Sequence, residues 1–179
     1  MTGGPGAEGN KTALAARRRT VGTAAAYAAA ALAFGYAAVS LYWALGGHAM
    51  VSTVGGYVQR FAREGGALPV LIALAAAVAK VIGGVLALAL VRPWGRAVPR
   101  GWLLLLGAAA STLLVVYGGL NVLAGGLVLA GAIHPAGGVD RMALRWHVGL
   151  WDLWFLVWGI LLALATAGYR RRTARRNTA

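Results

Sequence analysis

The sequence predicts an all-α integral membrane protein, built as a four-helix bundle. Sixty percent of its 179 residues are hydrophobic, 12% are charged, and the mean hydropathy is +0.70. A soluble domain of this size needs far more polar surface. The apolar residues also fall into four runs, each long enough for a helix to cross a bilayer core, which takes about 20 residues. Strands of a membrane β-barrel would be about half as long and would alternate in polarity.

The four spans are expected at about 20–45, 67–91, 102–133 and 146–169. The polar segment 1–19 is predicted to be a disordered basic tail. The apolar run after it exceeds the roughly 7–15 residues of a signal-peptide core, so we expect it to be kept as the first helix. The third run is long, and we expect it to tilt or fray at its glycine-rich outer end. Residues 170–179 form a second basic tail.

Basic residues predict the orientation. Twelve lie on the side of the two tails and the loop between the second and third spans, and four lie on the opposite side. The positive-inside rule therefore places both termini in the cytoplasm of a bacterium, with the chain in its inner membrane. The net charge of +13 is concentrated beside apolar runs. This distribution indicates anionic lipid headgroups as the partner of the cytoplasmic basic clusters and argues against nucleic acid.

The outer loops contain two helix-start signals. In the first, Ser52 or Thr53 is expected to cap a short interfacial helix, whose apolar face would comprise Val54, Val58 and Phe61. An irregular loop is the alternative. In the second, Asp140 is the expected N-cap of the fourth helix. Aromatic residues near the span ends fit interfacial belts, with Trp94 and Trp102 inside and Tyr42, Trp43, Trp146 and Trp151 outside.

The most polar intramembrane residues lie on the small-residue faces of their helices, which are the faces that pack closely in lipid. These residues are Ser40, Lys80, Asn121 and Asp152. We therefore expect them to line a common polar pocket that opens to the outer side. By the helical rise, Lys80 and Asn121 lie about 20 and 18 Å below the outer boundary, and Asp152 and Ser40 about 9 and 8 Å.

A charge in mid-membrane costs at least about 2.5–3.5 kcal/mol, so Lys80 needs compensation. One interpretation is a structural ion pair with Asp152 that sets the helix register. A second is a hydrated pocket that binds or passes a ligand. A third is contact between Lys80 and a partner protein.

A stripe of aromatic residues occupies another face of the fourth span. It comprises His147, Trp151, Trp154 and Trp158, at spacings of four, three and four. This face is expected to lie apart from Asp152. Lipid-facing or interhelical packing is one interpretation, and a groove for a lipid, isoprenoid or quinone-like ligand is the other.

Several chemistries lack support in the sequence. There is no cysteine, which excludes disulfides and thiol chemistry in this chain. The three histidines lack metal-ligand spacing within a helix, and no nucleotide or hydrolase motif is present. We therefore predict no cofactor, no metal site and no catalytic residue.

Two motifs resemble a known family. They are YWALGG at Tyr42–Gly47 and WHxxLWDxWF at Trp146–Phe155. Both are similar to segments of small actinobacterial four-helix membrane proteins of unknown function. The resemblance covers roughly residues 27–167 and implies the architecture, but it carries no established activity.

The leading functional hypothesis is a non-enzymatic module that binds a small molecule or ion, or takes part in transport, through the outward-facing polar pocket. A membrane enzyme or redox protein acting on a lipid or quinone-like substrate is the alternative, with His147 and Asp152 transferring protons. The third possibility is a structural subunit, in a homo-oligomer or a larger complex, with the tryptophan stripe as its interface.

Overall fold

The structure is a computed structural model that describes residues 5–54 and 66–174. The secondary structure of these residues is helical, without strands. The elements are α1 (Pro5–Ala44), α2 (Val51–Val54), α4 (Ala67–Ala89), the 3₁₀ turn η1 (Pro93–Ala97), α5 (Arg100–Leu129), α6 (Arg141–Trp146), the π turn η2 (His147–Trp151) and α7 (Asp152–Ala174).

Four helical segments are long and apolar enough to cross a membrane, as the sequence predicts. They are Arg19–Ala44, Ala67–Ala89, Arg100–Leu129 and Arg141–Ala174, the last of which joins α6, η2 and α7. The third helix ends at Leu129, four residues before its expected end. Gly131 then adopts a left-handed φ of 76°, a conformation that glycine takes without strain.

The first and last helices extend beyond the expected spans. α1 is helical from Pro5, within the segment expected to be a disordered tail. Proline suits the first turn of a helix, and the residues that follow include the good helix formers alanine, leucine and arginine. The fourth segment begins at Arg141 because the Asp140 carboxylate accepts hydrogen bonds from the backbone N–H groups of Met142 and Ala143, at 2.9 and 3.1 Å. The predicted Asp140 cap is therefore confirmed.

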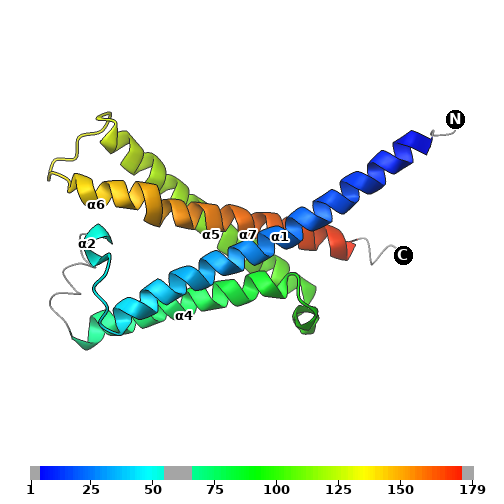
Figure 1. The fold of residues 1–179 in the computed structure, drawn as a ribbon, viewed down its shortest axis with the longest axis horizontal. Helices are drawn as coiled ribbons and strands as arrows, with labels where there is room; N and C mark the ends of the chain where they lie inside the picture. Colours follow the sequence, from blue (N-terminus) through cyan, green and yellow to red (C-terminus); the bar gives the residue numbers. More distant parts are fainter. Residues whose placement is uncertain (1–4, 55–65, 175–179) are drawn as a thin grey trace.

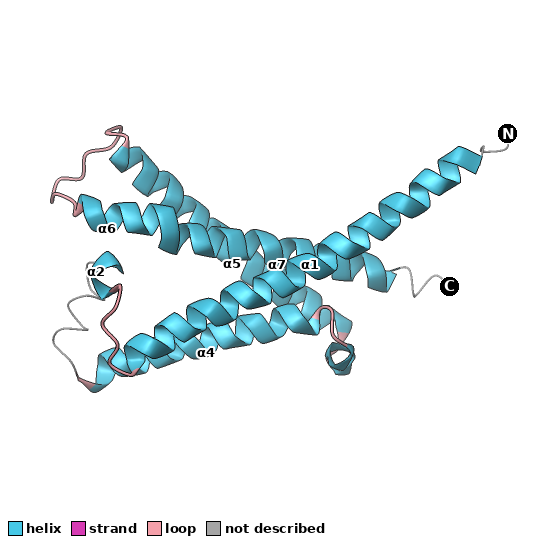
Figure 2. Cartoon of the chain, in the orientation of Figure 1, coloured by secondary structure: helices cyan, strands magenta, loops and turns pink. Residues whose placement is uncertain are grey.

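The long helices form two packed pairs. α1 packs along α4, α5 packs along α7, and α1 and α7 hold the pairs together, whereas α4 and α5 make few contacts. Figure 1 shows the pairs crossing where α1 meets α7 and diverging toward the end where α2 lies between them. The start of α1 and the end of α7 lie at the opposite end. The connections and the short α2 stand out in Figure 2.

Small residues allow the close approaches between helices. A Cβ atom placed on Gly118 of α5 would lie 2.5 Å from the backbone nitrogen of Leu156, and one on Gly159 of α7 would lie 2.8 Å from that of Val115. At the α1–α7 crossing, Gly22 and Gly168 meet in the same way. In lipid, the hydrophobic effect does not drive helices to associate. Close van der Waals packing, which small residues allow, must therefore hold the helices together.

The α2 segment covers the divergent end of the bundle. It packs against α6 and η2, and Val51 is buried there. α2 begins before Ser52 and Thr53, so it is a different turn from the interfacial helix expected after those caps. Most of that helix, with Val58 and Phe61, lies outside the described residues, and it stays a prediction. Within α2, the Thr53 hydroxyl donates to the carbonyl of Met50 at 2.6 Å.

Candidate functional site

A π turn determines the position of the first polar pair. In a regular α-helix, side chains five residues apart point about 140° away from each other, as the sequence analysis assumed for His147 and Asp152. The i→i+5 turn of η2 widens the helix and brings them together, with His147 Nδ1 and Asp152 Oδ2 3.3 Å apart. The prediction that they lie on different faces was therefore wrong. Asp152 is buried, and the His147 side chain is 33% exposed.

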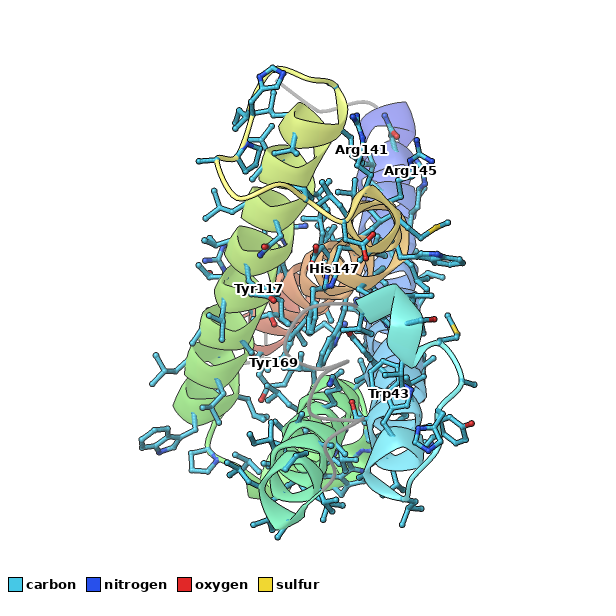
Figure 3. All side chains as sticks on the ribbon, turned by 90° about the vertical axis from the view of Figure 1, so that its left-hand side faces the viewer. Trp43, Tyr117, Arg141, Arg145, His147 and Tyr169 are labelled. Atoms are coloured by element: carbon cyan, nitrogen blue, oxygen red, sulfur yellow. The ribbon has the colours of Figure 1, made fainter. Side chains whose placement is uncertain are left out.

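The second ring nitrogen of His147 determines where its proton lies. Nε2 is 2.8 Å from the carbonyl oxygen of Val54. A carbonyl only accepts, so Nε2 must carry the hydrogen. A hydrogen bond between Nδ1 and Oδ2 then needs one further proton. This proton lies either on Nδ1 of His147, beside an ionised carboxylate, or on the Asp152 carboxyl, beside a neutral ring. In Figure 3, His147 lies near the centre of the bundle end, whereas Arg141 and Arg145 lie toward its edge.

Two further contacts hold the α2 end of the bundle. Trp151 Nε1 donates to the Thr53 hydroxyl at 3.2 Å, and Trp43 Nε1 donates to the carbonyl of Ala49 at 2.9 Å. Trp151 is only 2% exposed, so it is a packed interior residue and the expected role in an outer aromatic belt was wrong. The Trp151 bond, with that of His147, connects α2 to the start of the fourth helical segment, and the Trp43 bond links the end of α1 to the loop before α2.

Lys80 of α4 is compensated by neutral groups. Its ammonium donates to the Ser40 hydroxyl at 2.7 Å and lies 4.2 Å from the centre of the Tyr36 ring. The hydroxyl oxygen accepts a charge-assisted hydrogen bond, and the ring face attracts the cation. Within the described residues, the structure shows a 3.3 Å contact between Asp152 and His147 and no ion pair between Asp152 and Lys80. The proposed Lys80–Asp152 pair is therefore replaced by two separate arrangements.

Asn121 lies apart from both arrangements. Its side-chain amide donates to the carbonyl of Tyr117, one turn earlier on α5, at 2.8 Å. A bond of this kind satisfies the amide locally. The four expected pocket residues thus fall into three places: Lys80 with Ser40, Asp152 with His147, and Asn121 on its own helix.

Tyr36 is the residue that sequence reasoning missed. It is buried, and its ring packs against those of Trp151, Trp154 and Phe155, with centroids 4.9 to 5.6 Å apart. One signal was available, because Tyr36 lies four residues before Ser40 and so on the same helical face. Trp151 and Trp154 of the stripe therefore pack against α1, as in the interhelical interpretation.

One member of that stripe also borders a cavity. A groove of about 340 Å³ lies between α4, α5 and α7, and its lining includes Lys80 and Trp158. The Trp158 indole is 4% exposed, and its Nε1–H is buried without a hydrogen-bond partner. The benzo ring of Trp158 faces Gly83, about one turn after Lys80 along α4. A Cβ atom placed on Gly83 would lie 2.6 Å from this ring. A buried N–H of this kind is rare in native structures and needs an explanation.

The sequence matches one family model. Residues 33–162 match the model described as protein of unknown function (DUF3995). No curated protein and no solved structure matches the sequence. The matched range contains most of the chain and includes Tyr36, Ser40, Lys80, His147 and Asp152. The chain therefore belongs to the DUF3995 family, whose function is unknown, and the four apolar helices identify it as a multi-pass helical membrane protein.

Proposed function

We propose that this protein binds a small molecule or ion within the membrane, as a non-enzymatic or transport-related module, at a site anchored by Lys80. Its setting would be the bacterial inner membrane, with both termini in the cytoplasm and the basic clusters on anionic lipid. The divergent end of the bundle, where α2 lies, is then the outer end.

The observation that carries this proposal is the state of Lys80. An ionisable amine lies in the middle of a membrane-spanning helix, and its neighbours in the structure are a hydroxyl and an aromatic ring. Ionisable groups at such depth are expensive and mark ligand or ion pathways in many membrane proteins. A lysine that only fixed the helix register would be expected to form an ion pair with a carboxylate on the facing helix.

Thiol labelling tests whether the Lys80 site is reached by water from the outer side. The chain contains no cysteine, so a single introduced thiol reports on one position. Ser40→Cys is expected to react with a membrane-impermeant, anionic methanethiosulfonate added to the outer face of intact cells, because thiols react as hydrated thiolates. The same reagent added to the cytoplasmic face of inverted vesicles should label it much more slowly.

A matched control defines the dry interior. Ala33 lies two turns deeper on the same helix at a fully buried position, so Ala33→Cys should remain unlabelled. His48 is exposed in the outer loop, so His48→Cys should react fully. If Ser40→Cys is as inert as Ala33→Cys while His48→Cys reacts, the outward-facing pocket is refuted and the Lys80 arrangement is a packing feature.

The His147–Asp152 contact favours a second function, a membrane enzyme or redox protein acting on a lipid or quinone-like substrate. A carboxylate beside an imidazole is the arrangement that orients a general base. In the structure, Nε2 of His147 is hydrogen-bonded to the carbonyl of Val54 in α2. This function therefore requires α2 to move away so that Nε2 can reach a substrate. Visible absorption and metal analysis of the purified protein test the redox version, and a colourless, metal-free preparation would count heavily against it.

A further inference from the structure

We infer that the groove between α4, α5 and α7 binds the carboxylate of a single-chain fatty acid, whose oxygens accept hydrogen bonds from Lys80. This assignment rests on the proposed binding function and names its ligand. The groove is lined by residues of three helices: Ala76, Ala79, Lys80 and Gly83 of α4, Ala110, Leu113 and Leu114 of α5, and Phe155, Trp158 and Leu162 of α7.

The one charged side chain of the groove lining is a hydrogen-bond donor. The Lys80 ammonium has three N–H bonds, one of which is directed at Ser40. A ligand that satisfies the other two must therefore present acceptor oxygens.

Charge selects among acceptors. Lys80 is the only ionisable side chain among the lining residues, so the groove is cationic. A carboxylate would neutralise this charge, whereas a neutral carbonyl would leave it uncompensated in mid-membrane, where an unpaired charge is costly. Charge complementarity therefore favours an acid over an ester or a quinone.

Depth argues for a single chain. Lys80 lies 13 residues from the start of α4, about 20 Å along the helix by its rise, and so close to the middle of the bilayer. A phospholipid headgroup is held at the interface and would not reach it. A fatty acid has a small head and one chain, which can lie along the alanine, leucine and phenylalanine wall.

The groove also faces the lipid. α4 and α5 make few contacts, and Leu113, at the groove wall, is 70% exposed. A ligand dissolved in the bilayer can therefore enter from the side. Because its chain only exchanges lipid for protein, it gains no hydrophobic energy on entry. Binding should then depend mainly on the head, and substitution of Lys80 should have the largest effect.

Photo-crosslinking tests the assignment directly. The probe is palmitic acid with a mid-chain diazirine, added to the full-length protein in nanodiscs of phosphatidylcholine and phosphatidylglycerol. We expect crosslinked peptides from α4, α5 and α7, and competition by palmitate but not by methyl palmitate or decylubiquinone. Lys80→Met should reduce labelling at least tenfold, and Lys80→Arg less than Lys80→Met.

A second pair of variants leaves Lys80 intact. Ala79→Phe fills the groove from an exposed position and should abolish labelling, whereas Ala75→Phe, exposed on the same helix outside the lining, should not change it. Equal labelling of wild type and Lys80→Met would overturn the assignment. The assignment would also be overturned if methyl palmitate or decylubiquinone competed as effectively as palmitate, because that result would indicate a neutral ligand. If the probe fails to label while Ser40→Cys reacts from outside, the fatty-acid assignment falls and the binding function stands.

Discussion

Gly118 offers a sharp test of the α5–α7 interface. A Cβ atom at this position would lie 2.5 Å from the backbone nitrogen of Leu156 and 2.8 Å from the carbonyl oxygen of Asp152. Both obstacles are backbone atoms, so relief requires the two helices to move apart. Overpacking of this kind costs about 1–3 kcal/mol. Gly118→Ala should therefore destabilise the fold and displace the start of α7.

Gly126, two turns further along α5, is the matched control. Among the described residues, no atom outside its own stretch of helix lies within 4 Å of a Cβ placed there. Gly126→Ala shares the helix-propensity gain of a glycine-to-alanine change, about 1 kcal/mol, without the clash. The difference between the two variants therefore isolates the overpacking cost, and we expect it to be about 1–3 kcal/mol.

Reversible unfolding in mixed dodecylmaltoside and SDS micelles measures this difference. Tryptophan fluorescence serves as the signal because Trp151 and Trp154 pack against Tyr36 of α1 and Trp158 packs against Gly83 of α4. The reasoning would be refuted if Gly118→Ala proved as stable as Gly126→Ala. That result would mean that α5 and α7 do not approach each other backbone to backbone at this position.

Three further predictions concern single contacts. Trp154→Phe keeps an aromatic ring but loses the 3.1 Å hydrogen bond from Nε1 to the Leu32 carbonyl. It should lower the free energy of unfolding by about 0.5–1.5 kcal/mol in the same assay. Arg172→Ala loses the 3.0 Å bond to the Leu90 carbonyl at the end of α4, and should cost about 0.3–1 kcal/mol. His147→Ala removes the bond that holds α2 and should increase the rate of backbone hydrogen exchange there, measured by mass spectrometry.

Each of these has a control and a contrary outcome. Trp158→Phe removes an N–H that has no partner, so it should cost less than the change at Trp154, and the reverse order would contradict the hydrogen-bond assignment. Arg171→Ala, at an exposed neighbour, should leave stability unchanged, and equal losses at both arginines would point to a general charge effect. Unchanged exchange in α2 after His147→Ala would show that the other contacts suffice to hold it.

Several features of this protein could be predicted from its sequence because they depend on local properties of the chain. The length and apolarity of the four runs predict helices able to cross a membrane, because backbone groups in lipid must be satisfied within the helix. The Asp140 cap depends on residues two and three positions away. The division of the fourth helix into two packing faces is also local. In the structure Leu156 and Gly159 meet α5, whereas Trp151 and Trp154 meet α1.

The partners of the polar groups were decided only by the tertiary structure. The expected Lys80–Asp152 pair assumed regular helices and a common interior, but the widened turn at residues 147–151 rotates His147 toward Asp152. Lys80 instead meets Ser40 and Tyr36 because α4 packs along α1. The unpartnered N–H of Trp158 and the groove beside it likewise depend on how far α4 stands from α5 and α7. The rotation and separation of helices arise from packing across the whole bundle, which the periodicity of a single helix does not contain.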